Sequence, residues 1–346
     1  REMPECGSQV VLCDVPIRFD TYKGCSHLCK YCFVQKKSDI SNISKNETVK
    51  ALLSFIDGKR TNETKWCDWD IPLHWGGCSD PFQPIERKYR SSFEALKVFV
   101  KTQYPFIVST KGRLIAEPEY LELIKKCNCA VQISAVCREY DRLEPGAPTF
   151  EERLEMIKKI SEFKRVLVRI QPYMVEVHNS VAKNIERFAE AGAYGIIVEG
   201  MKFFKSKKGL IKVGGDICYP MQTLKPRFNA LKELAHSSGL KFYAGENRLR
   251  YMGDSLCCCG IDGLKGFKGN SYNINHFQNG GVEEPTAAMK NKGSAVAFKA
   301  ISQSTGESKR LNKTSFKKEM KDRFVNKRDY YDVMFGKADV KSKIRP

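Results

Sequence analysis

Short apolar, β-branched runs alternate with helical segments along the first two thirds of this 346-residue sequence. The alternation predicts an α/β fold with a parallel sheet, because a parallel connection needs a crossover and the crossovers here are helices. The expected strands are Val15–Thr21, Ile71–Gly76, Phe106–Ser109, Ala130–Val136, Val166–Ile170 and Gly195–Val198. The expected helices are Val49–Ile56, Ser92–Val100, Pro118–Lys126, Phe150–Phe163 and Ala182–Ala191. In a barrel built this way, reactive groups gather at the carboxyl ends of the strands.

One of these helices has a clearly marked start. Thr149 is followed three positions later by Glu152, which makes a capping box directly after the turn signal of residues 145–148. The apolar residues inside this helix recur at helical spacing, so we interpret them as core rather than as part of a cofactor site.

The strand–helix pattern loosens beyond residue 200. We therefore expect a barrel core over 1–200, a region over 201–285 that covers the barrel and contacts substrate, and a basic extension over 286–346. The second region is predicted to hold a helix near Arg227–His236 and a strand at Lys241–Ala244.

The charge of the chain is unusual, with 59 Lys and Arg against 40 Asp and Glu and a net charge of +19. Such an excess favours an anionic partner, with nucleic acid first and an anionic membrane second, although a well-solvated basic surface has the same composition. We see no run of about 18 apolar residues and so expect no membrane-spanning helix. We also find no basic-then-apolar leader at the start of the sequence.

The 14 cysteines need an explanation of their own. A disulfide framework is typical of short secreted domains, whereas this chain is long and three of its cysteines are tightly spaced. Metal or cluster ligation in a reducing compartment accounts for them better, so we expect a cytoplasmic protein.

The tight group is Cys25, Cys29 and Cys32, in the loop after the first predicted strand. Three thiolates can bind three irons of a 4Fe-4S cubane and leave the fourth iron open to the amino and carboxylate groups of S-adenosylmethionine. The alternative is a zinc knuckle, for which His27 is a nearby ligand.

The C-x3-C-x2-C spacing, with an aromatic residue on each side of the third cysteine, resembles the signature of radical S-adenosylmethionine (radical SAM) enzymes. Within that superfamily the chain resembles the spore photoproduct lyase family and its relatives over Asp20–Gly200. The resemblance implies a partial (β/α)6 barrel with the cluster at its carboxyl-end mouth, and a 5′-deoxyadenosyl radical as the reactive species. The segments that carry it are Cys25–Phe33, Gly77–Pro84, Ser109–Gly112, Ser134 and Glu144–Pro148.

The resemblance also implies roles for single residues. Tyr31, Ser79, Lys111 and Ser134 are implied to contact S-adenosylmethionine. A lysine such as Lys111 suits the carboxylate of that cofactor. The serines also fit a plainer role, because a serine at a strand end often only caps the next turn.

Cys78 lies near the point where the lyase family has a cysteine that donates a hydrogen atom to the product radical, and Tyr31 matches one of two tyrosines that relay a hydrogen atom there. A thiol suits this role because its S–H bond is weak compared with C–H; the alternative for Cys78 is a small buried packing residue. The chain departs from the family at Phe33, which has no phenolic hydrogen. The resemblance therefore favours a related reaction on a nucleic-acid base or sugar over photoproduct repair itself.

A second group of cysteines occupies residues 257–259. Because adjacent side chains diverge, we expect Cys257 and Cys259, helped by Cys218 or Cys67, to form any auxiliary metal site. The alternative is a local thiol cluster or a disulfide.

Two segments have the composition of a nucleic-acid contact. Lys202 and Lys205 belong to a lysine-rich loop, and Arg248, Arg250 and Tyr251 combine guanidinium groups with a ring that can stack on a base. The alternative for both segments is a solvated, charged surface.

Our leading hypothesis is a radical SAM enzyme acting on nucleic acid, DNA rather than RNA, with an external electron donor such as flavodoxin or ferredoxin. Its first rival is the same kind of enzyme acting on a peptide or small metabolite with an auxiliary cluster. Its second rival is a non-catalytic, metal-stabilised nucleic-acid-binding module.

Overall fold

The computed structural model describes residues 13–36, 38–46, 48–59, 70–213, 216–270, 273, 275 and 276. Cys67 and the expected basic extension over 286–346 lie outside these residues. None of the described helices is long and apolar enough to cross a bilayer.

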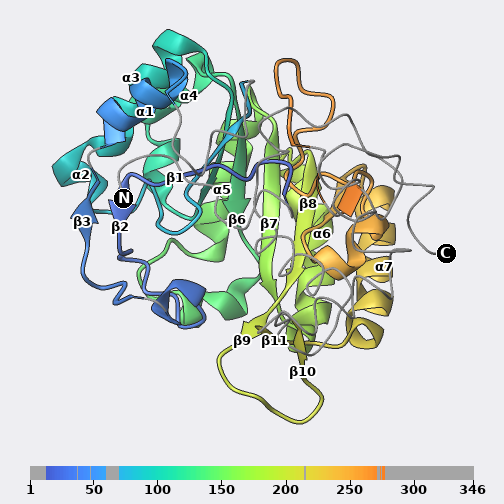
Figure 1. Ribbon diagram of the computed structural model, residues 1–346. Helices are drawn as coiled ribbons and strands as arrows, with labels where there is room; N and C mark the ends of the chain where they lie inside the picture. The colour runs from blue at the N-terminus through green and yellow to red at the C-terminus, as the bar shows by residue number, and fades with distance from the viewer. Residues whose placement is uncertain are drawn as a thin grey trace, which may run out of the picture.

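A seven-stranded parallel sheet organises the described chain (Figure 1). Six strands correspond to predicted ones, so the predicted α/β fold with a parallel sheet is confirmed. The seventh is the predicted strand at residues 241–244, which pairs in parallel with its neighbour and carries the sheet beyond residue 200. In spatial order the strands are β1 (Arg18–Phe19), β4 (Leu73–Trp75), β5 (Phe106–Thr110), β6 (Cys129–Ser134), β7 (Val166–Tyr173), β8 (Gly195–Gly200) and β12 (Lys241–Ala244).

Helices connect the strands, as predicted. The capping box forms at the start of one of them, where Thr149 donates its N–H to the Glu152 carboxylate over 2.7 Å. The last helix begins at Met221 rather than near Arg227, because Pro226 is accommodated inside it instead of preceding it. The helices are α1 (Thr48–Ile56), α2 (Glu86–Tyr89), α3 (Ser91–Thr102), α4 (Pro118–Lys126), α5 (Phe150–Ser161), α6 (His178–Glu190) and α7 (Met221–Ser237).

Shorter elements complete the fold. Two small antiparallel sheets pair β2 (Tyr22–Lys23) with β3 (Ser44–Lys45), and β11 (Asp216–Cys218) with both β9 (Lys202–Phe203) and β10 (Ile211–Val213). Because β9 follows β8 directly, the β9–β11 sheet marks the carboxyl end of the large sheet, at the bottom of Figure 1. The 3-10 helices are η2 (Phe33–Lys36), η3 (Arg113–Ala116), η4 (Arg138–Leu143), η5 (Val175–Val177) and η6 (Asn247–Met252).

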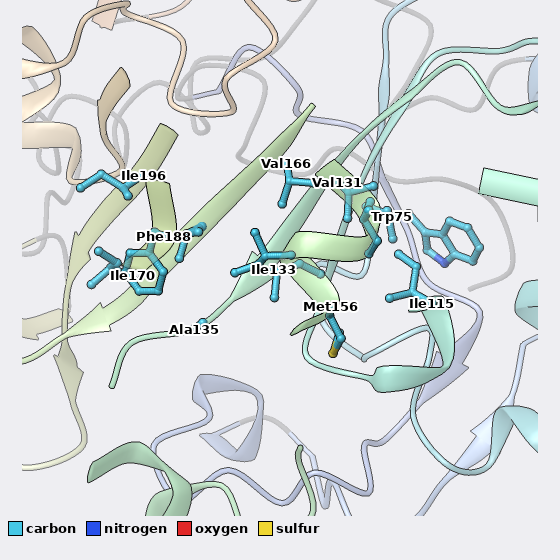
Figure 2. Close-up of a cluster of buried hydrophobic side chains, with 14 of the residues drawn as sticks. Trp75, Ile115, Val131, Ile133, Ala135, Met156, Val166, Ile170, Phe188 and Ile196 are labelled. Atoms are coloured by element: carbon cyan, nitrogen blue, oxygen red, sulfur yellow. The ribbon is translucent and has the colours of Figure 1, made fainter. Parts of the chain in front are cut away.

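The main core lies between the sheet and the helices. Figure 2 shows Trp75 of β4 together with Val131 and Ile133 of β6 in this buried cluster. The rings of Phe99 in α3 and Phe106 in β5 stack with their centroids 4.0 Å apart. Because successive residues of a strand point to opposite faces, the residues between these apolar ones point to the other face, into the barrel.

Candidate functional site

The predicted cluster cysteines lie in a loop over residues 24–32, between β2 and η2. Cys25 donates its N–H to the carbonyl of Ile40 over 2.7 Å, and Lys30 donates to the carbonyl of Leu143 over 2.9 Å. These bonds tie the loop to the segment before β3 and to the end of η4, so its backbone is fixed from two directions.

Residues that follow β4 hold the loop from a third direction. The Ser79 hydroxyl donates to the carbonyl of Gly24, and the Gln83 amide donates to Ser79 Oγ over 3.1 Å. Gln83 also accepts the N–H of Ser26 over 2.8 Å. Ser79 is buried, and its hydroxyl helps to position the cysteine loop.

Asp80 joins the cysteine loop to the end of β5. Its carboxylate accepts the Thr110 hydroxyl over 2.7 Å and the N–H of Lys111 over 2.6 Å. The same carboxylate lies 3.4 Å from Nδ1 of His27. Asp80 was not predicted as a site residue, yet it fixes Lys111 relative to the cysteine loop.

The spacing of the three thiols fits a cluster better than a single ion. Cys29 is buried, and Cys25 and Cys32 are half-buried. Burial raises the pKa of Cys25 to about 12 and that of Cys29 to about 11. A tetrahedral zinc holds its thiolates roughly 4 Å apart, whereas these three are not among the described ligand groups that gather within 4.8 Å. In a cubane, each thiolate binds a different iron, which suits the wider spacing.

Two buried polar atoms of this loop also point to a missing group. Ser26 Oγ and His27 Nε2 have no hydrogen-bond partner among the described residues. Both residues lie between the first two cysteines, and a buried polar atom without a partner is costly. A bound cluster would lie beside them, so the loop fits an iron–sulfur cluster.

Glu144 is the centre of a buried charged group beside the loop. Its carboxylate accepts the Tyr31 hydroxyl and pairs with the guanidinium of Arg153, and Lys111 Nζ lies 3.8 Å away. Burial raises the pKa of Glu144 to about 7, against the opposing effect of Arg153. The structure thus brings together Tyr31 and Lys111, both predicted cofactor contacts, around a carboxylate and an arginine that were not predicted.

Ser134 ends β6 next to this group. Arg153 donates to the carbonyl of Ser134 over 2.9 Å, and the Ser134 hydroxyl lies 3.5 Å from the carbonyl oxygen of Gln171. Three of the four predicted cofactor contacts, Tyr31, Lys111 and Ser134, therefore lie together around Glu144 and Arg153. The fourth, Ser79, instead hydrogen-bonds to the cysteine loop at Gly24.

The turn after Glu144 contacts the cysteine loop directly. Gly146 donates its N–H to the carbonyl of His27 over 3.1 Å. A Cβ added at Gly146 would lie 1.9 Å from the carbonyl oxygen of Ser26, so no larger residue fits without moving the loop.

Cys78 is exposed just beyond the carboxyl end of β4, which decides against the buried packing role. Its N–H donates to the Asp20 carboxylate over 3.2 Å, and its Sγ lies 3.8 Å from a guanidinium nitrogen of Arg18. Burial raises the pKa of Asp20 to about 7. The thiol is thus held next to Ser79, the residue that positions the cysteine loop.

A row of polar side chains crosses the inside of the barrel from β4 to β8. His74 Nε2 lies 2.9 Å from Ser109 Oγ, and Arg169 donates to Gln132 over 2.7 Å. These residues alternate with buried apolar ones along their strands, which is the sequence signal that would have revealed them. In strand order they are His74, Ser109, Gln132, Arg169, Gln171 and Glu199.

The lysine-rich loop between β9 and β10 extends from the carboxyl end of the sheet (Figure 1). Lys205, Lys207 and Lys208 are exposed there. Lys202, in contrast, pairs with the buried carboxylate of Glu246 over 3.0 Å.

The structure corrects the prediction for two arginines. Arg248 and Arg250 are only 4% and 3% exposed. Arg248 pairs with Glu246 over 2.8 Å, and Arg250 donates to Asn247 over 2.7 Å. Side chains buried in this way cannot reach a phosphate backbone. Tyr251 is 51% exposed, and its contact with nucleic acid stays a prediction.

The structure gathers a different set of thiols from the predicted auxiliary one. The sulfur atoms of Cys13, Cys258 and Cys259 lie within 4.8 Å of one another. Cys218 lies apart, in β11, and Cys257 Sγ accepts the N–H of Cys259. The predicted set was wrong because adjacent side chains were expected to diverge, whereas Sγ of Cys258 and Sγ of Cys259 are 3.9 Å apart.

Comparison with known proteins gives distant matches. No protein-family model matches the chain. Uncharacterized proteins of Mycobacterium bovis and Mycobacterium tuberculosis are 23% identical to it over 212 residues, which is 56% of this chain. The match spans 62% of each relative, or about three fifths of its length.

Among solved structures, the chain matches spore photoproduct lyase. A variant with bound AdoMet (S-adenosylmethionine) and dinucleoside spore photoproduct gives a TM-score of 0.54 at 14% identity, and a variant with dinucleoside spore photoproduct gives 0.55 at 14%. Each match covers 66% of this chain and 76% of the lyase. This chain has the spore photoproduct lyase fold. The predicted partial barrel of the radical SAM enzymes is thereby confirmed. In this chain the cysteine loop lies beside the carboxyl ends of β5 and β6, where Tyr31, Lys111 and Ser134 meet.

Proposed function

We propose that this chain is a radical SAM enzyme that holds a 4Fe-4S cluster on Cys25, Cys29 and Cys32. The observation that carries the proposal is the cysteine loop itself. Its three thiols do not gather within 4.8 Å as a single ion would hold them, two unsatisfied polar atoms lie beside them, and the fold is that of a lyase solved with bound AdoMet. A thiol trio leaves one iron of a cubane open. The zinc-knuckle rival does not account for the spacing.

The residues around Glu144 suit the cofactor. Lys111 offers an ammonium group for a carboxylate, and Tyr31 and Ser134 offer hydroxyl groups beside it. Glu144 positions Tyr31 through a hydrogen bond and Lys111 through its charge, and the guanidinium of Arg153 balances the charge of Glu144. With the cluster and S-adenosylmethionine bound, this site would supply a 5′-deoxyadenosyl radical.

Cys78 is the residue we assign to hydrogen-atom transfer. It is exposed, and backbone bonds to Asp20 hold it beside the loop that would carry the cluster. Donation of its thiol hydrogen to a carbon-centred product radical forms a C–H bond and leaves a thiyl radical, which must then be reduced or passed on. Tyr31 lies at the same mouth and can take part in that relay.

The proposed substrate is a nucleic acid, with DNA favoured because the matched lyase was solved with a dinucleoside photoproduct. The exposed lysines of the β9–β10 loop lie at the same end of the sheet as the cysteine loop, where they can contact phosphates. The target base would have to leave its stack to enter a barrel mouth. Phe33, exposed in η2, leaves the pair of family tyrosines incomplete, so the reaction proposed is a relative of photoproduct repair.

The enzyme would need an external one-electron donor, such as a flavodoxin or ferredoxin, and a reducing cytoplasm suits its free thiols. The half-buried Cys32 and the exposed Phe33 place one side of the cysteine loop near the surface, where such a donor can approach.

The experiment for the substrate is hydrogen tracing. Anaerobic protein with reconstituted cluster, S-adenosylmethionine and dithionite is incubated with deuterated DNA or deuterated peptide, and 5′-deoxyadenosine is examined by mass spectrometry. Deuterium entering 5′-deoxyadenosine from DNA supports the proposal. Transfer from peptide alone would favour the rival that acts on peptides.

A charge-reversal variant separates binding from chemistry. Lys205→Glu combined with Lys207→Glu and Lys208→Glu should lower DNA affinity and reduce the slope of log affinity against log salt by about 0.9 per lost phosphate contact. The matched control reverses three exposed lysines on α3 and α4, namely Lys97, Lys101 and Lys125. If the two variants lose the same DNA affinity, the β9–β10 loop is not the DNA contact.

A further inference from the structure

The thiols of Cys13, Cys258 and Cys259 form a compact group away from the cysteine loop. Their sulfur atoms lie within 4.8 Å of one another, and no other described group of three such ligand residues does so. In a tetrahedral zinc site, thiolates lie roughly 4 Å apart. The spacing thus has the scale of a single ion, in contrast to the wider set at Cys25, Cys29 and Cys32.

The group lies inside the barrel. Cys257 and Cys259 pack against Ile107 and Ala130, near the amino ends of β5 and β6, and Gln132 donates to the carbonyl of Cys259 over 2.9 Å. The cysteine loop lies at the opposite, carboxyl end of the sheet. The two thiol groups are therefore separate sites.

A buried cation beside the group donates no hydrogen bond to a carboxylate of the described residues. Arg250 is 3% exposed, and its Nε has no hydrogen-bond partner among the described residues. Its other nitrogens reach only the neutral oxygens of Asn247 and Leu256. Its charge interacts with Cys13, Cys258 and Cys259, and also with Asp14, a carboxylate that pairs with His276 and forms no described ion pair with Arg250.

A second cation faces the same group. Arg169 is half-buried and contacts neutral oxygens of Ser109, Gln132 and Gln171. Its charge interacts with Cys258 and with the buried carboxylate of Glu199. Neither arginine forms a direct ion pair with a carboxylate of the described residues, and a buried cation is costly unless negative groups beside it offset its charge. Three thiolates around a divalent cation carry a net negative charge and supply that offset.

We propose that Cys13, Cys258 and Cys259 bind one soft divalent metal ion, zinc by preference, at a site distinct from the cluster loop. Each ligating thiol releases its proton to solvent on binding, and no electron is transferred. Cys257, whose Sγ lies 3.4 Å from the Cys259 nitrogen, offers a further thiol for the fourth position. The ion would fasten the segment before β1 to the segment after η6, so that both ends of the described fold close the inside of the barrel.

The test counts metals in a chain that cannot hold the cluster. Cys25→Ala, Cys29→Ala and Cys32→Ala are combined, the protein is purified anaerobically with zinc in the medium, and zinc, iron and sulfide are measured. The proposal predicts about one zinc per chain and no sulfide. Further substitution of Cys258→Ser and Cys259→Ser should remove at least nine tenths of that zinc, whereas Cys127→Ser, at a buried thiol outside the group, should retain it.

A second measurement guards against unfolded variants. Metal-free protein with the cysteine loop substituted is titrated with cobalt(II), and the thiolate-to-cobalt charge-transfer band and the visible bands of tetrahedral cobalt are recorded. Saturation at about one cobalt per chain supports the site. Absence of both zinc and the cobalt bands, zinc that survives loss of Cys258 and Cys259, or about four irons with sulfide at these cysteines would each overturn it.

Discussion

The hydroxyl of Tyr31 donates a hydrogen bond to the buried carboxylate of Glu144, in the turn that follows η4. The same carboxylate pairs with Arg153, whose side chain is 1% exposed. The cysteine loop, the predicted cofactor contacts and α5 are thus joined through one buried acid.

Glu144→Gln should destabilise the fold strongly. The substitution leaves Arg153 as an uncompensated buried charge, which costs about 3–5 kcal/mol of unfolding free energy. Chemical denaturation of the cluster-free protein measures the change. Glu155→Gln, at an exposed position of α5, the helix that holds Arg153, should stay within about 0.5 kcal/mol of the parent. Equal stability of the two variants would show that the Glu144 pair is not formed.

Gly146→Ala should lower cluster loading without abolishing the fold. The added Cβ would meet the carbonyl oxygen of Ser26, so the cysteine loop must move. Iron per chain after anaerobic reconstitution is expected to fall severalfold. Gly58→Ala provides the control, because Gly58 has a left-handed φ of 87° but nothing within 4 Å of its added Cβ. Full loading in Gly146→Ala would refute the close contact.

Asp20→Asn should change how stability depends on pH. Burial raises the pKa of Asp20 from 3.8 to about 7, so between these values the unfolded chain loses a proton that the folded chain keeps. This group therefore lowers wild-type stability as pH rises, by about 1.4 kcal/mol per pH unit.

As the pH rises from about 4 to about 7, the unfolding free energy of wild type should therefore fall relative to that of Asp20→Asn. Urea denaturation at several pH values measures it, with the exposed Asp57→Asn as control. Parallel pH profiles for Asp20→Asn and wild type would mean that Asp20 ionises normally.

Cys78→Ala should leave cofactor cleavage within about twofold of wild type, because Cys78 is not a cluster ligand in our proposal. The products from nucleic acid should change instead, since the product radical loses its hydrogen donor. Chromatography of 5′-deoxyadenosine and of the digested nucleic acid follows both quantities in one reaction. An unchanged product pattern would remove Cys78 from the relay, and Cys137→Ala, at a buried cysteine, serves as control.

The strands and helices were predictable because their patterns are local. Apolar runs such as that of β6, whose residues are all buried, are typical of strands covered on both faces. The capping box of α5 was equally readable, since its partners are three residues apart. The start of α7 was missed because a proline usually precedes a helix or ends one, and Pro226 does neither.

The site was only partly predictable, because its remaining features depend on distant pairing. Arg153 belongs to the first turns of an amphipathic helix, and nothing local shows that it turns inward to Glu144. Arg248 was expected at the surface as a charged residue, yet pairing with Glu246 buries it. Cys13 had no assignable partner in sequence, because the thiols that it meets lie at the far end of the described fold.

The most direct test of the radical SAM assignment is cofactor cleavage by anaerobically reconstituted protein. Protein loaded with about four irons and four sulfides per chain is mixed with S-adenosylmethionine and dithionite, and 5′-deoxyadenosine is quantified beside the variant that lacks Cys25, Cys29 and Cys32. We predict 5′-deoxyadenosine and methionine from the loaded protein and none from the variant. A fully loaded cluster that releases no 5′-deoxyadenosine, or zinc in place of iron at these three thiols, would contradict the assignment.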